Sequence, residues 1–321
     1  MKTYLTVLIC SLPLLAFSQY TEVINSNRPG VSQSAFAVGP NVIQFEAGPY
    51  YTKEKHTPLE YDVKGMGIDF TARYGLLWEP LELVLNGTFQ RDKFTDNRSA
   101  ISADYTRSNF KALTLGAKYL VYDPYKNAEE EKPNIYSWKA NRKFKWSRLI
   151  PAVSVFAGVN YDTKDNPYTA PGLDGVSAKV ALITQHNFTN GWVFVMNLMG
   201  NRIGSSDFEK QYIFTLTHGF NEKWVAFGEY QAIDGSFYSD DLFRLGGAYL
   251  LNKNFQIDTA VTFNVKDTPS VFSLNLGASY RLDFHKDKEP DDNGTSAQEE
   301  EERRINREKS TNGSSDFIIP D

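Results

Sequence analysis

The sequence predicts an all-β protein, namely a transmembrane antiparallel up-and-down β-barrel of about twelve strands. Three observations support this fold class. Long segments alternate apolar and polar residues, the chain opens with a secretory leader, and short turns alternate with longer links. Together these features are typical of barrels in the outer membrane of the Gram-negative envelope.

The alternation is clearest in residues 271–284. Apolar residues of one parity run from Phe272 to Phe284, and the other parity is polar and includes Arg281 and Asp283. Successive side chains of a strand point to opposite faces, so this segment has one apolar and one polar face. It exceeds the roughly five or six residues usual in soluble sheets and suits a membrane-spanning strand. We therefore expect lipid on the apolar face and water on the polar face.

Other segments repeat this pattern, and their total is even, as expected for outer-membrane barrels. The segment 224–232 is the weakest, because Phe227 shares a face with Glu229 and Gln231. The remaining predicted strands are residues 42–51, 66–76, 81–90, 111–121, 152–162, 176–188, 192–202, 211–220, 242–251 and 255–265.

The links between strands give an independent indication. Short turns, such as 77–80 and 189–191, follow even-numbered strands, whereas Arg91–Arg107 and Thr163–Gly175 are longer links after odd-numbered strands. Short turns face the periplasm in such barrels, so both termini are predicted to be periplasmic. Aromatic residues flank the short turns, as in an interfacial girdle. They are Trp78, Phe188, Trp192, Phe220, Trp224 and Phe255.

Residues 1–18 are predicted to be a signal peptide. Lys2 supplies the positive charge, Leu5–Leu15 the apolar run, and Ala16-Phe17-Ser18 the cleavage site. Cys10, in this leader, is the only cysteine. The mean hydropathy is −0.43, which alternating barrel strands allow.

The mature chain is predicted to have three further parts. Residues 19–41 form either a leader before the first strand or a segment tucked against the barrel mouth or lumen, with Arg28 paired to an interior carboxylate. Residues 42–284 form the barrel. Residues 285–321 form an acidic, largely disordered periplasmic tail.

Two regions are candidates for contacts with other molecules. The basic periplasmic link 123–149 suits anionic lipid headgroups or an acidic partner, or is a solvated loop on the barrel rim. A short apolar motif closes the tail and is either a binding site for a periplasmic protein or an incidental cluster. It consists of Phe317, Ile318, Ile319 and Pro320. Phe284 ends the last strand, where the barrel-assembly machinery reads an aromatic residue. No nucleic-acid partner is expected for an exported chain.

Charged residues assigned to the lumen by parity carry both signs. They either form a salt-bridge network across the lumen or line the path of a small solute. If they form a network, neutralising Arg73 or Arg281 lowers the heat resistance of the barrel. These residues are Glu46, Asp69, Arg73, Glu82, Lys118, Asp162, Lys179, Glu229, Arg244, Asp258, Arg281 and Asp283.

No catalytic residue, metal site or cofactor is predicted. The histidines are far apart in the sequence and have no metal-ligand spacing. No nucleophile elbow or phosphate-binding loop occurs. His186 and His218 fall on the lipid-facing parity near short turns, where an interfacial position is the simpler interpretation.

The run Asn25-Ser26-Asn27-Arg28-Pro29-Gly30-Val31-Ser32-Gln33-Ser34, followed by Glu46-Ala47-Gly48, resembles the opening of an outer-membrane barrel family. That family is named for transport in the meta-pathway of phenol degradation. Asn27 replaces a common Asp, and Val31 replaces a common aromatic. The resemblance implies a channel or transporter for small solutes, hydrophobic ones included. The alternative is a non-conducting scaffold in the outer membrane that binds periplasmic partners through its basic link and tail.

Overall fold

The computed structural model describes residues 23–76, 78–125 and 150–285. The predicted signal peptide, most of the basic link and the tail motif therefore lie outside the described residues. The chain divides into one unit, Met1–Phe284, and a second, His285–Asp321. Only the first is described below.

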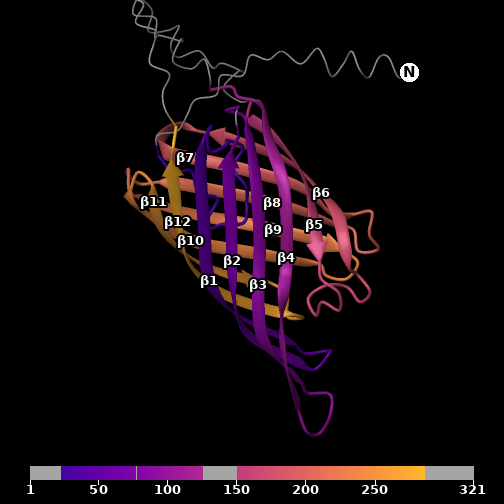
Figure 1. Cartoon of the computed structure of the whole chain (residues 1–321). Helices are drawn as coiled ribbons and strands as arrows, with labels where there is room; N and C mark the ends of the chain where they lie inside the picture. Colours follow the sequence, from indigo (N-terminus) through magenta and orange to yellow (C-terminus); the bar gives the residue numbers. More distant parts are fainter. Residues whose placement is uncertain (1–22, 77, 126–149, 286–321) are drawn as a thin grey trace, which may run out of the picture. The chain divides into compact units, whose positions relative to one another are not determined.

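Twelve antiparallel strands close into a barrel, which confirms the predicted fold class (Figure 1). Each strand pairs with its neighbours in sequence, and β1 pairs with β12 to close the ring. The strands are β1 (Val42–His56), β2 (Tyr61–Gly75), β3 (Leu81–Asp96), β4 (Ala103–Tyr122), β5 (Ala152–Asp162), β6 (Gly175–Asn187), β7 (Trp192–Ile203), β8 (Glu209–Gly219), β9 (Trp224–Gly235), β10 (Asp240–Asn252), β11 (Phe255–Asn264) and β12 (Ser270–Asp283).

Each predicted segment overlaps one of these strands, and the first four strands extend several residues beyond their predicted ends. The expectation that Arg91–Arg107 is a loop is wrong, because β3 continues to Asp96 and β4 begins at Ala103. Polar pairs hold this part of the hairpin together in water, including Lys93 and Asp104 at 2.8 Å. Figure 1 shows the β3–β4 hairpin projecting beyond its neighbours.

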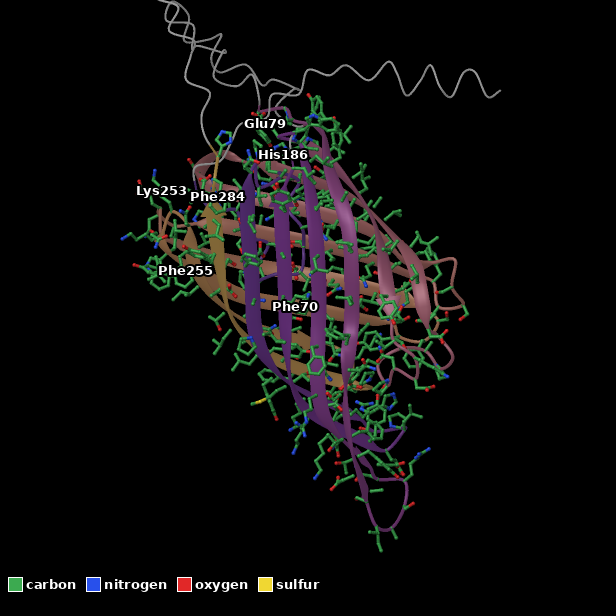
Figure 2. All side chains as sticks on the ribbon, viewed as in Figure 1. Phe70, Glu79, His186, Lys253, Phe255 and Phe284 are labelled. Carbon is green, nitrogen blue, oxygen red and sulfur yellow. The ribbon has the colours of Figure 1, made fainter. Side chains whose placement is uncertain are left out.

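The outer surface of the barrel is apolar. Phe45, Met66 and Leu276 are among its large exposed side chains, with 49%, 69% and 55% of their surfaces accessible. Figure 2 shows side chains covering the outside of the wall. A closed barrel satisfies its own backbone hydrogen bonds, so this exterior can meet lipid directly. The structure is that of a membrane-spanning β-barrel. No helix in the described part of the chain is long and apolar enough to cross a membrane.

Aromatic rings gather at the rim that carries the short turns, here called the turn rim. The ring of His218 stacks on Trp192 at a centroid distance of 4.3 Å, and the ring of His186 lies 4.2 Å from that of Phe188. Figure 2 places His186, Lys253 and Phe284 at this rim. Amphipathic rings of this kind are enriched where a membrane protein meets the headgroups. The opposite end is here called the loop rim.

Candidate functional site: a plugged lumen

Residues 23–41 lie inside the barrel and are here called the plug. The plug begins near the turn rim, where the amide of Ile24 donates a hydrogen bond to the carbonyl of Lys253 at 2.8 Å. It returns to that end before β1, where the amide of Asn41 donates to the carbonyl of Gly75 at 3.0 Å. It contains no strand, so its backbone groups need partners from the wall.

Side chains of the wall supply these partners around almost the whole ring. Polar side chains replace the backbone ladder that a strand would have used. The hydrogen bonds run between Asn27 and Glu46 (β1), Asn25 and Arg73 (β2), Val38 and Glu82 (β3), Ser34 and Lys118 (β4), Ala35 and Ser154 (β5), Ser34 and Gln185 (β6), Gln33 and Asn197 (β7), Ser32 and Thr215 (β8), Val31 and Glu229 (β9), Arg28 and Gln256 (β11), and Ser26 and Ser279 (β12).

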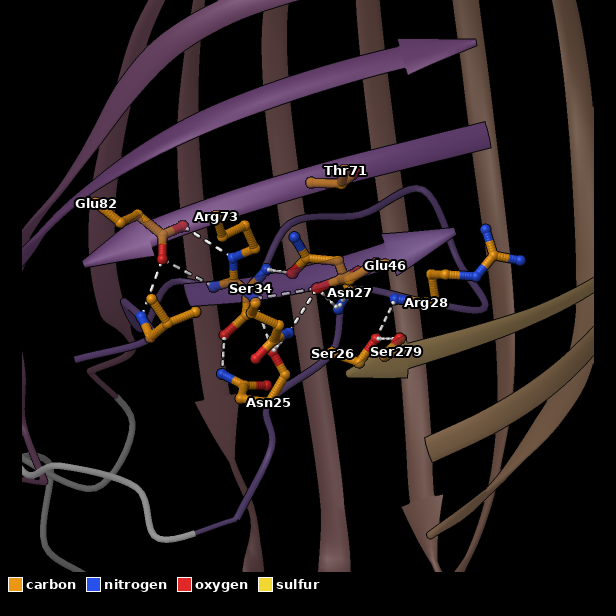
Figure 3. A network of polar contacts seen from close by, with 12 residues as sticks. Asn25, Ser26, Asn27, Arg28, Ser34, Glu46, Thr71, Arg73, Glu82 and Ser279 are labelled. Carbon is orange, nitrogen blue, oxygen red and sulfur yellow. Dashed lines mark hydrogen bonds and ion pairs between the residues drawn. The ribbon is translucent and has the colours of Figure 1, made fainter. Parts of the chain in front are cut away.

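A buried charge network holds one side of the plug. Arg73 contacts Glu82 at 3.0 Å and Glu46 at 3.4 Å, and Lys118 contacts Glu82 at 2.7 Å. Arg73 and Lys118 also donate to the plug carbonyl of Phe36, at 3.2 and 3.0 Å. Figure 3 shows Arg73, Glu46 and Glu82 converging on the plug. The two cations balance the two carboxylates, which offsets the cost of burying charge.

Arg28 holds the other side of the plug. Its guanidinium lies 3.2 Å from the carboxylate of Asp258 on β11. The Asp258 side chain is fully buried, and the Arg28 side chain is 10% exposed. A Cβ atom added to Gly48 or to Gly277 would collide with this guanidinium. Gly48 on β1 and Gly277 on β12 thus form a slot that Arg28 fills. Asn27-Arg28 and Glu46-Ala47-Gly48 are the two segments on which the family resemblance is based. They contact each other, because Asn27 bonds to Glu46 and Arg28 lies against Gly48.

Glu229 binds the backbone of the middle of the plug. Its carboxylate accepts the amides of Val31 and Ser32 at 3.1 Å and the guanidinium of Arg244 at 2.9 Å. A Cβ atom on Gly30 would lie 2.5 Å from this carboxylate. Only glycine therefore allows the plug backbone to approach so closely.

An apolar patch of the inner wall packs against the end of the plug. Ala35 is fully buried there, and Phe36 packs beside it. This patch excludes water around the hydrogen bonds of the charge network, which strengthens them. Its wall residues are Val84, Leu120, Ala152, Phe156, Ala181, Ile183, Met199 and Ile213.

The plug lies between two cavities of the lumen. The loop-side chamber has a volume of about 260 Å³ and is lined by polar residues that include Asp69, Asn160 and Lys179. The turn-side chamber has a volume of about 230 Å³ and a wall that is partly apolar, with Val195 and Phe227. The plug residues 27–30 line both chambers and form the septum between them.

The remaining residues assigned to the lumen make more local contacts. Asp69 accepts a hydrogen bond from Thr88 at 2.7 Å, and Asp162 pairs with Arg202 at 3.2 Å. Arg281 pairs with Asp283 at 2.9 Å. Arg73, Glu82, Lys118 and Glu46 form one cluster, whereas these three contacts lie apart from it.

The sequence places several uncharged residues on the polar faces of the strands but does not identify them as partners of the plug. Ser154, Gln185 and Asn197 share the parity of the charged residues, so their inward position was available from the same alternation. Arg202 was also missed; it pairs with Asp162, Asp207 and Glu209 near the loop rim. In the described part of the chain, no group of His, Cys, Asp and Glu is arranged to hold a metal ion.

The predicted scaffold contacts and tail motif fall on residues 126–149 and 286–321, outside the described part of the chain. They stay predictions.

Comparison with solved structures gives distant likenesses to other barrels. An outer-membrane channel from Pseudomonas putida F1 aligns with a TM-score of 0.48 and 10% identity, over 81% of this chain and 100% of that one. The transport unit of the autotransporter AIDA-I from Escherichia coli aligns with a TM-score of 0.47 and 10% identity, over 87% and 97%. These overlaps are too loose for a function to be transferred.

A search of curated proteins finds no match. One family model, described as "Putative MetA-pathway of phenol degradation", matches residues 26–282. That range covers most of the plug, the Arg28 slot and nearly all of the barrel wall. The chain belongs to this family of outer-membrane barrels.

Proposed function

We propose that this protein is a gated outer-membrane channel for small solutes, in which the plug must move before a solute can pass. The septum carries this proposal. Chambers of about 260 and 230 Å³ lie on its two sides, and residues 27–30 line both. Displacing this short stretch would join the chambers into one path along the barrel axis.

The size and the polar contacts of the lumen favour a plug that can move over a permanently filled barrel interior. About eight strands give an interior filled by side chains, and sixteen or more give an open pore. With twelve strands, this barrel is intermediate, and its remaining space is occupied by a peptide segment. The plug is held mainly by hydrogen bonds and ion pairs, which water can replace when the segment moves.

Both termini are proposed to be periplasmic. The plug begins next to Lys253. Phe284 directly follows β12 at the same turn rim, where its amide donates a hydrogen bond to the carbonyl of Asn41. Short turns of outer-membrane barrels face the periplasm. A catalytic role is not proposed, because His186 and His218 pack in the aromatic rim rather than beside a nucleophile.

A reversible disulfide tests the gate. The hydroxyl oxygens of Ser26 and Ser279 are 2.7 Å apart and join the plug to β12 (Figure 3). Cys10, in the predicted leader, is the only native cysteine, so Ser26→Cys with Ser279→Cys creates one defined pair. In planar bilayers, the oxidised pair should stay closed, and reduction should restore the wild-type openings.

Two further variants complete the test. Each single-cysteine variant should ignore the oxidant and conduct as the wild type does. Deletion of residues 26–36 should give a larger and steadier conductance than the wild type. If the deletion variant folds but passes no current, the channel proposal is wrong. If the oxidised pair conducts normally, the plug is not the gate.

A further inference from the structure

Lys179 is a cation that faces the loop-side chamber from β6. It shares a face of the strand with Ser177 and Ala181, which are both buried in the lumen. The pairing of β6 with β7 is irregular between Ala178 and Val180, directly at this residue. The side chain is half-buried. Charged side chains at membrane depth are rare and almost always face the protein interior or a water-filled cavity. Such a residue is therefore a candidate functional residue.

The other cations that line this chamber are neutralised by carboxylates. Arg28 lies 3.2 Å from Asp258, Arg202 lies 3.2 Å from Asp162, and Arg244 lies 2.9 Å from Glu229. These ion pairs leave the three guanidinium groups with little net charge to offer a solute.

Lys179 differs from them in having no such partner. In the part of the chain that the structure describes, its ammonium group makes no ion pair or hydrogen bond. Glu209 attracts it electrostatically, but the carboxylate of Glu209 is already held by Arg202, Asn201 and Gln211. Lys118 on β4 shows the contrast, because Glu82 lies 2.7 Å from its ammonium.

We propose that Lys179 anchors a binding site for a small monocarboxylate in the loop-side chamber. This inference rests on the proposed channel function and names the class of solute. An ammonium group and a carboxylate form a short, charge-assisted hydrogen bond. One ammonium group pairs with one carboxylate. Asp69, which also lines the chamber and accepts a hydrogen bond from Thr88, disfavours a solute with a second negative charge such as a phosphate dianion. The volume of about 260 Å³ lies just below the usual ligand cavity of about 300–1,000 Å³, so the solute is small.

Binding can be measured without any current through the channel. Fluoroacetate is added to the full-length protein in detergent, and the broadening of its fluorine NMR signal reports binding. Fluoroacetamide, which has nearly the same shape but no charge, is the control ligand. We expect wild-type protein to broaden the fluoroacetate signal and to leave that of fluoroacetamide sharp.

Lys179→Gln should weaken fluoroacetate binding about tenfold, and Lys179→Arg should retain it. Lys210→Gln is the matched control. Lys210 is an exposed lysine on β8 whose ammonium lies 3.9 Å from Asp234. It should bind as the wild type does.

The site would be overturned if Lys179→Gln broadened the fluoroacetate signal as much as the wild type does. It would also be overturned if the wild type broadened the signals of both ligands equally, or broadened neither signal. Bilayer currents decide the channel proposal separately. A plug-deletion variant that conducts while Lys179→Gln binds normally rejects the carboxylate site alone. A deletion variant that folds but never conducts rejects the channel itself.

Discussion

Arg73 illustrates how single residues fix the plug. Its guanidinium reaches two glutamates and the carbonyls of Asn25 and Phe36, and its side chain is fully buried. The alternation of β2 placed it in the lumen, but nothing in the sequence identified the plug carbonyls as its partners. Backbone carbonyls occur at every residue, so a sequence cannot indicate which of them a buried cation will reach.

The first prediction concerns Arg73→Gln. Removing one partner of a buried ion pair leaves the other charge uncompensated, which costs about 3–5 kcal/mol. Glu82 keeps Lys118 as a partner, so we expect the free energy of unfolding in detergent to fall by about 3 kcal/mol. The transition from folded to unfolded mobility on a gel should shift to lower temperature.

Lys93→Gln is the control for this prediction. It removes the same charge from an exposed pair with Asp104, and such pairs contribute about 0–1 kcal/mol. If Arg73→Gln melted at the same temperature as Lys93→Gln, the buried network would not stabilise the barrel.

The second prediction concerns the glycine slot. Gly277→Ala places a methyl group where the guanidinium of Arg28 lies. The arginine must leave Asp258, so we expect the plug to loosen and the barrel to lose about 3 kcal/mol of stability. Limited proteolysis of the folded protein should then cleave within residues 23–41 faster than in the wild type.

Gly228→Ala is the matched change for that test. Its new Cβ atom would meet only Leu245 at 3.4 Å, an ordinary contact distance. It should leave the plug protected. Protection of the plug in Gly277→Ala as well would mean that Arg28 does not need the slot.

Phe227 is an apolar residue on the polar face of β9, and the structure explains why it lies there. It shares the lumen face of β9 with Glu229, and this aromatic residue on a polar face weakened the prediction of that strand. In the structure it is 8% exposed and lines the turn-side chamber beside Gly30. A lumen that holds a peptide has local apolar positions, so the expectation of a uniformly polar interior was too simple.

At the scale of elements, the strands were predictable and their outer ends were not. Alternation locates a strand wherever one face meets lipid. The contrast is weaker beyond the membrane, because both faces of a hairpin meet water there. The β3–β4 hairpin therefore resembled a loop in composition, although pairs such as Phe94 and Tyr105 continue its register.

The third prediction concerns this hairpin. Replacing residues 95–104 with an Asn-Gly turn keeps Phe94 opposite Tyr105 and removes mainly exposed pairs. Asn-Gly favours the tight turn that two-residue hairpins use. We expect the free energy of unfolding to change by less than about 1 kcal/mol, as measured by urea titration of the protein in detergent. A loss of several times that size would mean that the hydrogen bonds of Asn97 to Glu60 and Asp62, which this change also removes, stabilise the barrel.

At the scale of the whole molecule, the alternation of apolar and polar residues was sufficient to predict the architecture of the barrel. It gave twelve strands, a polar lumen and an apolar exterior, because membrane and water impose the same rule on every strand. The route of the plug obeys no such period. Its partners are single side chains from eleven different strands, brought together only when the wall closes.

The plug contacts the strands at which the barrel wall closes, where β1 pairs with β12. The plug meets β1 through Glu46, β12 through Ser279 and β11 through Asp258. The plug directly precedes the first strand in the chain, yet two of these three contacts come from the last two strands. A plug that is missing or misplaced therefore removes side-chain contacts that link the two ends of the barrel wall.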